Sequence, residues 1–113
     1  MLVVHDKIAL IDLKKMSTDT FGQLVKVVVD VKKEIMAVDA DLHSDEEAFM
    51  LEHGSKQEDL WGINIYPDMD TDQWIEFDSM INLRPGQGNR SRGVDSPHTQ
   101  QLIIKIVNKL VVR

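Results

Sequence analysis

The chain has 113 residues, no cysteine and a formal net charge of -6 at pH 7. This length suits one hydrophobic core, so we expect a single domain over residues 1–113, and the lack of cysteine excludes disulfides, thiol nucleophiles and thiolate metal sites. The net negative charge of the chain argues against duplex DNA as a partner, because affinity for DNA comes largely from basic residues that neutralise its phosphates.

No apolar run approaches the ~18 residues that a membrane span needs, and the opening segment meets His5 and Asp6 too early for a signal peptide. We therefore expect a soluble cytoplasmic protein with no membrane partner. The charge is unevenly distributed, because residues 41–82 hold one lysine against 12 acidic residues, while residues 83–113 hold 6 basic residues against Asp95. This asymmetry leaves room for a local basic site.

The first half of the chain predicts a helix and a β-hairpin. Residues 8–20 have helical character and end just before Gly22, a residue type that suits the position after a helix. Residues 24–31 and 35–43 are rich in β-branched and apolar residues and predict two paired strands. Alternation along the second strand predicts one core-facing row and one polar row, namely Met36, Val38, Ala40 and Leu42 against Asp39, Asp41 and His43.

The middle of the chain predicts a short helix and a second hairpin. Ser44 and Glu47 have the spacing of a capping box, so we expect a helix to begin there and to end near His53. Residues 60–66 and 74–84 read as two further strands separated by an acidic turn, and we expect them to pair.

The last part predicts a loop over residues 84–93 and then a helix, with Ser96 as the N-cap and Pro97 at the first helical position. An apolar stripe follows in that helix, formed by Leu102, Ile103, Ile106, Val107 and Leu110. The predicted fold is therefore α+β, in the order α-β-β-α-β-β-α. We expect a two-layer sandwich in which helices cover one face of an antiparallel sheet and the other face is partly wet.

The loop over residues 84–93 is the first candidate site. Arginine forks bind phosphate or carboxylate, glycines let backbone amides approach an anion, and the following helix adds a positive N-terminus. The alternative is that the arginines pair with the acidic middle of the chain. The candidate ligand-binding residues are Arg84, Gly88, Asn89, Arg90, Ser91 and Arg92.

A second candidate is a divalent-metal site on the polar strand faces. Carboxylates on facing strands could hold magnesium, calcium or manganese, and an imidazole would admit zinc or iron. The alternatives are a solvated polar face and, for the imidazole, a structural hydrogen bond. The candidate ligands are Asp39, Asp41, His43, Glu76 and Asp78.

Four stretches together resemble a known family. They are His-Ser-Asp-Glu-Glu at 43–47, Gly-Ser-Lys-Gln-Glu-Asp-Leu-Trp-Gly-Ile-Asn at 54–64, Ile-Glu-Phe-Asp-Ser at 75–79, and Arg-Pro with Gly-Asn-Arg-Ser-Arg within 84–92. The chain resembles an uncharacterised bacterial family of similar length that is known only as a domain of unknown function. The resemblance covers residues 21–112. It implies a single domain and brings no activity, substrate or cofactor with it.

The sequence leaves three functional hypotheses. The leading one is a binding module whose loop at residues 84–93 captures a phosphate- or carboxylate-bearing ligand, such as a nucleotide or an RNA end. The second is a metal-dependent phosphoester hydrolase, with carboxylate ligands and arginines that stabilise developing charge. The third is a protein-interaction domain or homodimer without catalysis, which would use an edge or a face of the sheet.

Overall fold

The computed structural model describes residues 1–113. The helices are α1 (Leu10–Asp19), α2 (His43–Glu52) and α3 (Pro97–Leu110). The strands are β1 (Leu2–Val4), β2 (Ile8–Ala9), β3 (Val25–Asp30), β4 (Ile35–Val38), β5 (Leu60–Ile65), β6 (Ile75–Glu76) and β7 (Val111–Val112). Three short 3-10 helices are η1 (Gln57–Asp59), η2 (Met80–Asn82) and η3 (Pro85–Gln87). The predicted α+β class is confirmed, and none of the helices has the length and apolar character that a membrane span requires.

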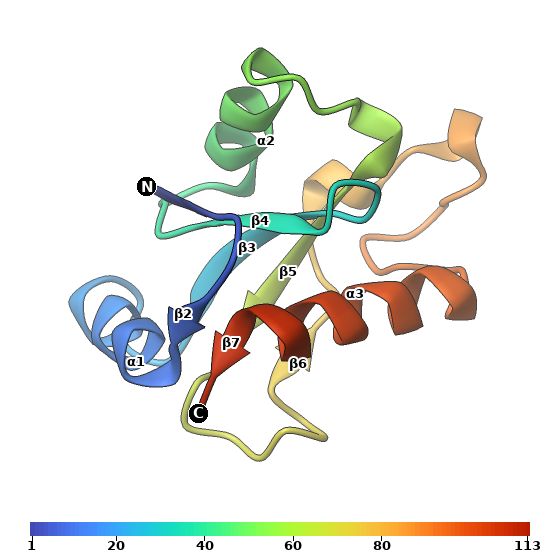
Figure 1. The fold of residues 1–113 in the computed structure, drawn as a ribbon. Coiled ribbons are helices and arrows are strands. Elements are labelled where there is room, and N and C mark those ends of the chain that lie inside the picture. Colours follow the sequence, from blue (N-terminus) through green and yellow to red (C-terminus); the bar gives the residue numbers. More distant parts are fainter.

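Five strands form one antiparallel sheet in the order β1-β4-β3-β5-β6. β3 and β4 form the predicted first hairpin, in which Val28 lies opposite Ala37. β5 lies on the other side of β3, with Gly62 opposite Val28, and β6 pairs with β5. β2 and β7 form a separate parallel pair, which places Ile8 and Ala9 beside the C-terminal residues Val111 and Val112 (Figure 1). β3 is therefore the central strand, and its two faces determine where the helices pack.

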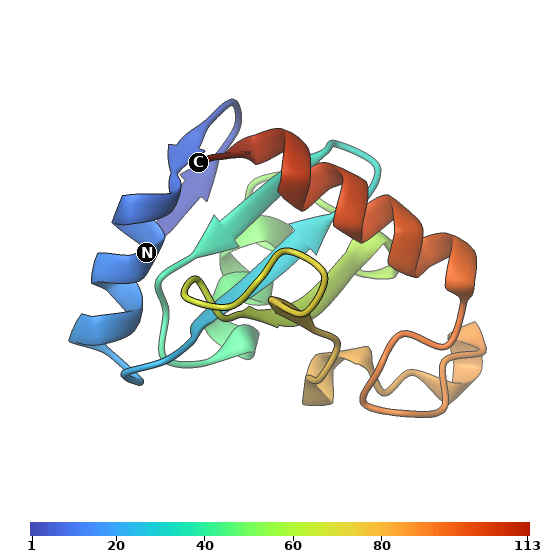
Figure 2. The ribbon, with the colours of Figure 1, turned by 90° about the horizontal axis from the view of Figure 1, so that it is seen from below.

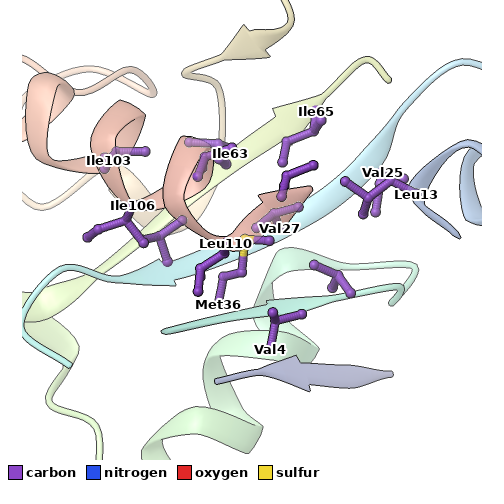
Figure 3. Close-up of a cluster of buried hydrophobic side chains, with 14 of the residues drawn as sticks. Val4, Leu13, Val25, Val27, Met36, Ile63, Ile65, Ile103, Ile106 and Leu110 are labelled. Carbon is purple, nitrogen blue, oxygen red and sulfur yellow. The ribbon is translucent and has the colours of Figure 1, made fainter. Parts of the chain in front are cut away.

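The larger core lies between α3 and one face of the sheet, which α3 crosses along its length (Figure 2). α3 contributes four buried residues of the predicted stripe, Ile103, Ile106, Val107 and Leu110. They belong to one cluster with Val27 and Ile63 of the sheet (Figure 3). α1 adds Leu13 to the same cluster. This face is the covered face that the amphipathic helix predicts.

α2 packs on the opposite face, so the prediction of a two-layer sandwich with one wet face is wrong (Figure 1). Met50 of α2 forms a second core with Val28, Ala37 and Leu60. The physical reason lies in β3, where Val27, Val28 and Val29 are all fully buried. A continuous apolar run in a strand is typical of burial on both faces, whereas a half-wet strand alternates.

The start of α3 agrees with the sequence prediction, because Ser96 Oγ accepts a hydrogen bond from the amide of Thr99 and Pro97 is the first helical residue. α1 is shorter than predicted at its start, since residues 8 and 9 form β2 instead. Gly22 follows the end of α1 with φ of 90°, a left-handed conformation that glycine adopts without strain.

The polar row predicted along the second strand does not form. β4 ends before Asp39, whose φ of 67° breaks the alternation, and Asp41 is exposed in the connection that follows. His43 becomes the first residue of α2. The predicted capping box is also absent, because the N-cap is Leu42 and no side chain caps this helix.

The strand predicted over residues 74–84 ends after Glu76, and the chain continues into η2 and η3. There the side chain of Asn82 makes the hydrogen bonds to the backbone of β5 that a neighbouring strand would otherwise make. Its Oδ1 accepts from the Gly62 amide at 2.8 Å, and its Nδ2 donates to the Gly62 carbonyl at 2.9 Å. Gly62 must be glycine for this close packing, since a Cβ would lie 2.5 Å from the Cβ of Ser79.

Replacing Asn82 by alanine leaves the buried amide and carbonyl of Gly62 without partners. We expect Asn82→Ala to reduce the free energy of unfolding by about 3 kcal/mol, measured by urea denaturation. The control is Asn108→Ala, which changes an exposed residue of α3 and should cost within about 0.5 kcal/mol. Equal losses in the two variants would contradict this role of Asn82.

Candidate functional site

Arg84, the first residue of the predicted anion-binding loop, anchors that loop to the fold. Its guanidinium donates to the carbonyl of Gln57 and, at 2.7 Å, to that of Leu60. It also stacks over the ring of Trp61, 4.3 Å from the ring centroid. Burial lowers the pKa of this guanidinium, and the Glu47 carboxylate acts in the opposite direction. Arg84 therefore binds the chain's own backbone at the start of β5.

The side chain of Asn89 holds the loop in shape through hydrogen bonds to the backbone. It is buried, and its Nδ2 donates to the carbonyls of Asn82 at 2.8 Å, Gly93 at 2.9 Å and Ser91 at 3.1 Å. Its Oδ1 accepts from the amide of Asp95 at 2.8 Å. The side-chain groups of Asn89 are thus engaged in holding the shape of the loop.

An internal carboxylate uses donors that the sequence assigned to a ligand. Asp95 accepts from the amide of Arg90 at 2.7 Å and from the hydroxyl of Ser91. The Ser91 hydroxyl, followed by the Arg90 amide, lowers the pKa of Asp95. Gly88 supplies the turn, with φ of 89°. Asp95, which follows the loop, therefore already occupies two of the loop's donors.

The other two arginines of the loop, Arg90 and Arg92, lie in different environments. The side chain of Arg90 is exposed and makes no hydrogen bond or ion pair. Arg92 donates through Nε to Oδ1 of Asp78 at 2.7 Å, and it lines a cleft. Of the six residues predicted to bind a ligand, Arg92 alone is among the residues of this cleft.

The cleft has a volume of about 210 Å³ and lies where the start of α2 meets β3, β5 and η2. Three apolar residues, Leu42, Met80 and Ile81, form part of its wall. Its polar lining consists of Lys26, His43, Ser44, Asn64, Asp78, Ser79 and Arg92. Both charged and hydrogen-bonding groups from separate parts of the chain therefore converge on it.

The N-terminus of α2 opens on this cleft. Leu42, the N-cap, offers no side-chain acceptor, and the amides of His43 and Ser44 donate no hydrogen bond within the chain. The first amides of a helix carry the positive end of its dipole and bind anions when no side chain caps them. These two amides are donors available at the cleft.

Two cations flank the same cleft. Lys26 of β3 has no carboxylate partner, and its amine lies 5.2 Å from the centroid of the Phe21 ring. Arg92 contacts Asp78 through Nε, so its two terminal nitrogens remain available. With Asp78 as the carboxylate in the lining, the cleft carries a net positive charge within a chain of net charge -6.

His43 presents a neutral imidazole to the cleft. Its Nε2 donates to the carbonyl of Ile63 at 2.7 Å, which is a structural hydrogen bond, and Nδ1 has no partner. Burial lowers the pKa of His43, with a smaller opposing contribution from the Ile63 hydrogen bond. The ring is therefore neutral near pH 7, with Nδ1 as an unused acceptor.

Asn64 and Tyr66 hold the carboxylate of Glu76 on the sheet. Asn64 Nδ2 donates to Glu76 Oε1 at 2.8 Å, and the Tyr66 hydroxyl donates to the same oxygen at 3.1 Å. Burial raises the pKa of Tyr66, and its bond to Glu76 adds to the shift. Because Glu76 can only accept, the amide of Asn64 is fixed with its nitrogen toward that carboxylate.

The five residues predicted as metal ligands are not brought together. Asp39 lines a separate depression beside α1, and Asp41 is exposed. His43 and Asp78 lie at the cleft, while Glu76 is held by its neighbours on the sheet. No group of three or more histidine, aspartate or glutamate side chains could hold a metal ion. The geometry therefore offers a metal no ligand set among these residues.

The sequence interpretation missed Lys26 and Asn64 at the cleft and treated Ser44 only as a helix cap. Lys26 had a recognisable signal, since it is the one charged residue within the valine run of β3. It also missed Glu46 of α2, which is fully buried and has two carboxyl oxygens without a hydrogen-bond partner. Burial raises the pKa of Glu46 to about 10. The spacing of His43, Glu46 and Met50 on one helix face could have indicated this burial.

These features define an α+β domain with helices on both faces of its sheet and a positively charged cleft at the start of α2. The chain belongs to the family described as "Protein of unknown function (DUF5674)", which matches residues 2–110. The predicted resemblance to a family of unknown function is confirmed. No curated protein and no solved structure matches the chain.

Glu46 makes the stability of the fold depend on pH. Its carboxyl has a pKa of about 10 in the folded chain against an ordinary value of 4.5, so the folded state keeps a proton that the unfolded state releases. Stability contributed by this proton is complete below about pH 4.5 and is lost as the pH rises toward 10. We expect the free energy of unfolding to fall as the pH rises across that window, because the unfolded state then binds fewer protons than the folded state.

Glu46→Gln removes the titrating group while keeping its shape, so the decline with pH should become much shallower in urea denaturation series. Glu52→Gln, an exposed change on the same helix, should leave the wild-type decline in place. Parallel declines in the wild type and Glu46→Gln would rule out a buried protonated Glu46.

Proposed function

We propose that the protein is a binding module for a small phosphate- or carboxylate-bearing group, which it holds in the cleft at the start of α2. The observation that carries this proposal is the convergence of an uncapped helix N-terminus with Lys26 and Arg92. The ligand class is the one expected from the sequence, while the site lies beside the loop of residues 84–93 rather than within it.

The donor set suits an oxyanion. Two backbone amides, from His43 and Ser44, and the hydroxyl of Ser44 supply directional hydrogen bonds. The terminal nitrogens of Arg92 add charge-assisted bonds. Lys26 adds a mobile point charge. The several oxygens of a carboxylate or phosphate group can share these donors among them and carry the negative charge that Arg92 and Lys26 attract, which a neutral ligand does not.

The size of the cleft limits what enters it. A volume of about 210 Å³ is below the usual range for a whole drug-sized ligand, so it suits a phosphate or carboxylate head group. A nucleotide or an RNA end would place its terminal phosphate here and leave the rest of the molecule outside. Asp78 opposes binding through its own charge, and the incoming anion shares Arg92 with it.

The neutral state of His43 is compatible with this role. A protonated imidazole would add charge but would lose Nδ1 as an acceptor. In the neutral ring, Nδ1 can accept a hydrogen bond from a hydroxyl or a singly protonated phosphate. The chemistry supported by these contacts is recognition of an anion.

The proposal is tested by thermal unfolding with inorganic phosphate, citrate, adenosine monophosphate and a terminally phosphorylated RNA oligonucleotide. A ligand at about a hundredfold its Kd stabilises the folded state by about 2.7 kcal/mol, which raises the Tm by several degrees. We expect such a shift with at least one of these anions, and we expect Lys26→Met combined with Arg92→Ala to abolish it.

Arg90→Ala is the matched control, because Arg90 belongs to the same loop but not to the cleft lining. It should retain the full shift. The proposal fails if none of the four anions stabilises the wild type. It also fails if the shift survives in the Lys26 and Arg92 double variant.

A further inference from the structure

The largest cavity of the molecule lies at the other end of α2, between that helix and β1, and has a volume of about 630 Å³. Its floor is apolar, with contributions from Val3 of β1, Ile35 of β4, and Phe49 and Met50 of α2. Leu2 at its margin is 47% exposed. The cavity is thus an apolar groove, and it is separate from the cleft at the start of α2.

One wall of this groove is a free sheet edge. β1 is the outermost strand, paired with β4 on one side and with no strand on the other. Every second residue of such a strand directs its amide and carbonyl outward, where an added strand can bind them. The opposite edge of the sheet differs, because β6 has two residues and Asn82 occupies the edge of β5 beyond it.

The charged side chain that lines the groove is positive. It belongs to Lys33, and no carboxylate is among the lining residues. This contrasts with the net charge of -6 on the whole chain. Lys33 forms no ion pair and lies near the end of α2, since a Cβ on Gly54 would be 3.0 Å from its amine. The rim is therefore complementary to a negatively charged partner.

The same charge argues against a second copy of this chain as the occupant. Two copies joined through this edge about a twofold axis would bring their Lys33 side chains, both positive, toward each other. Like charges brought together at an interface disfavour association. The positive charge of the groove therefore favours an acidic partner and disfavours a second copy of this chain.

We infer that the groove between β1 and α2 binds an extended peptide segment of another protein, one that combines apolar and acidic side chains and adds to the sheet beside β1. Main-chain hydrogen bonds to β1 would hold the segment, while alternate side chains enter the apolar floor. Its carboxylates would face Lys33. The inference is independent of the proposed anion cleft, which involves none of these residues.

The test begins with selection of a phage-displayed library of random short peptides against the immobilised full chain. We expect the selected peptides to be enriched in acidic and β-branched or aromatic residues. Binding of a labelled selected peptide, followed by fluorescence anisotropy, should weaken roughly fivefold or more in Lys33→Glu. Lys32→Glu is the matched control, because Lys32 is an exposed neighbour outside the groove, and it should bind like the wild type.

A second measurement uses the wild type alone, so it does not depend on any variant. Amide hydrogen exchange at β1 should slow when the selected peptide is added, because the outward amides gain partners. The inference is overturned if selection gives no enrichment, if Lys33→Glu binds the peptide as tightly as Lys32→Glu, or if β1 exchange is unchanged. It is also overturned if light scattering shows a dimer that the peptide dissociates.

Discussion

The paired hydrogen bonds between the side chain of Asn82 and the backbone of Gly62 are the interaction on which the candidate site depends. They satisfy the amide and carbonyl of Gly62 on the edge of β5 beyond the end of β6, where no neighbouring strand is present. The same Nδ2 also donates to the carbonyl of Arg92 at 3.0 Å, and Ser79 donates to that carbonyl through its amide at 2.9 Å. The backbone that carries Arg92 is therefore held beside the cleft by a group buried in the sheet.

The parts of the fold that local patterns determine were predictable. α3 combines an N-cap, a proline and a wide apolar stripe, and the first hairpin is built from two β-branched runs. The strand predicted over residues 74–84 was wrong in its second half, where the side chain of Asn82 hydrogen-bonds the backbone of β5 in place of a strand. No local sequence pattern indicates such a hydrogen bond. The prediction of two layers was also wrong. The unbroken run of Val27, Val28 and Val29, all fully buried, indicates a strand covered on both faces, which an analysis of alternation alone overlooks.

The candidate site was predictable only in part. The loop of residues 84–93 was recognised as rich in anion-binding groups, but Arg84, Asn89 and Ser91 use those groups on the chain itself. Which donors a loop consumes internally depends on tertiary partners such as Asp95 and Leu60, so composition alone could not separate Arg92 from its neighbours. Lys26 and the start of α2 come from distant parts of the chain and meet Arg92 only in the folded state.

The parallel pair of β2 and β7 has a kinetic consequence. Ile8 lies opposite Val111, so the pair closes a loop of about 100 residues, and Lys7 reinforces it by donating to the carbonyl of Lys109 at 2.8 Å. Contacts of such long sequence separation are costly to form early, whereas the β3 and β4 hairpin closes over a few residues. We therefore expect the β2 and β7 pair to form late in folding, so that its stability affects the rate of unfolding more than the rate of folding.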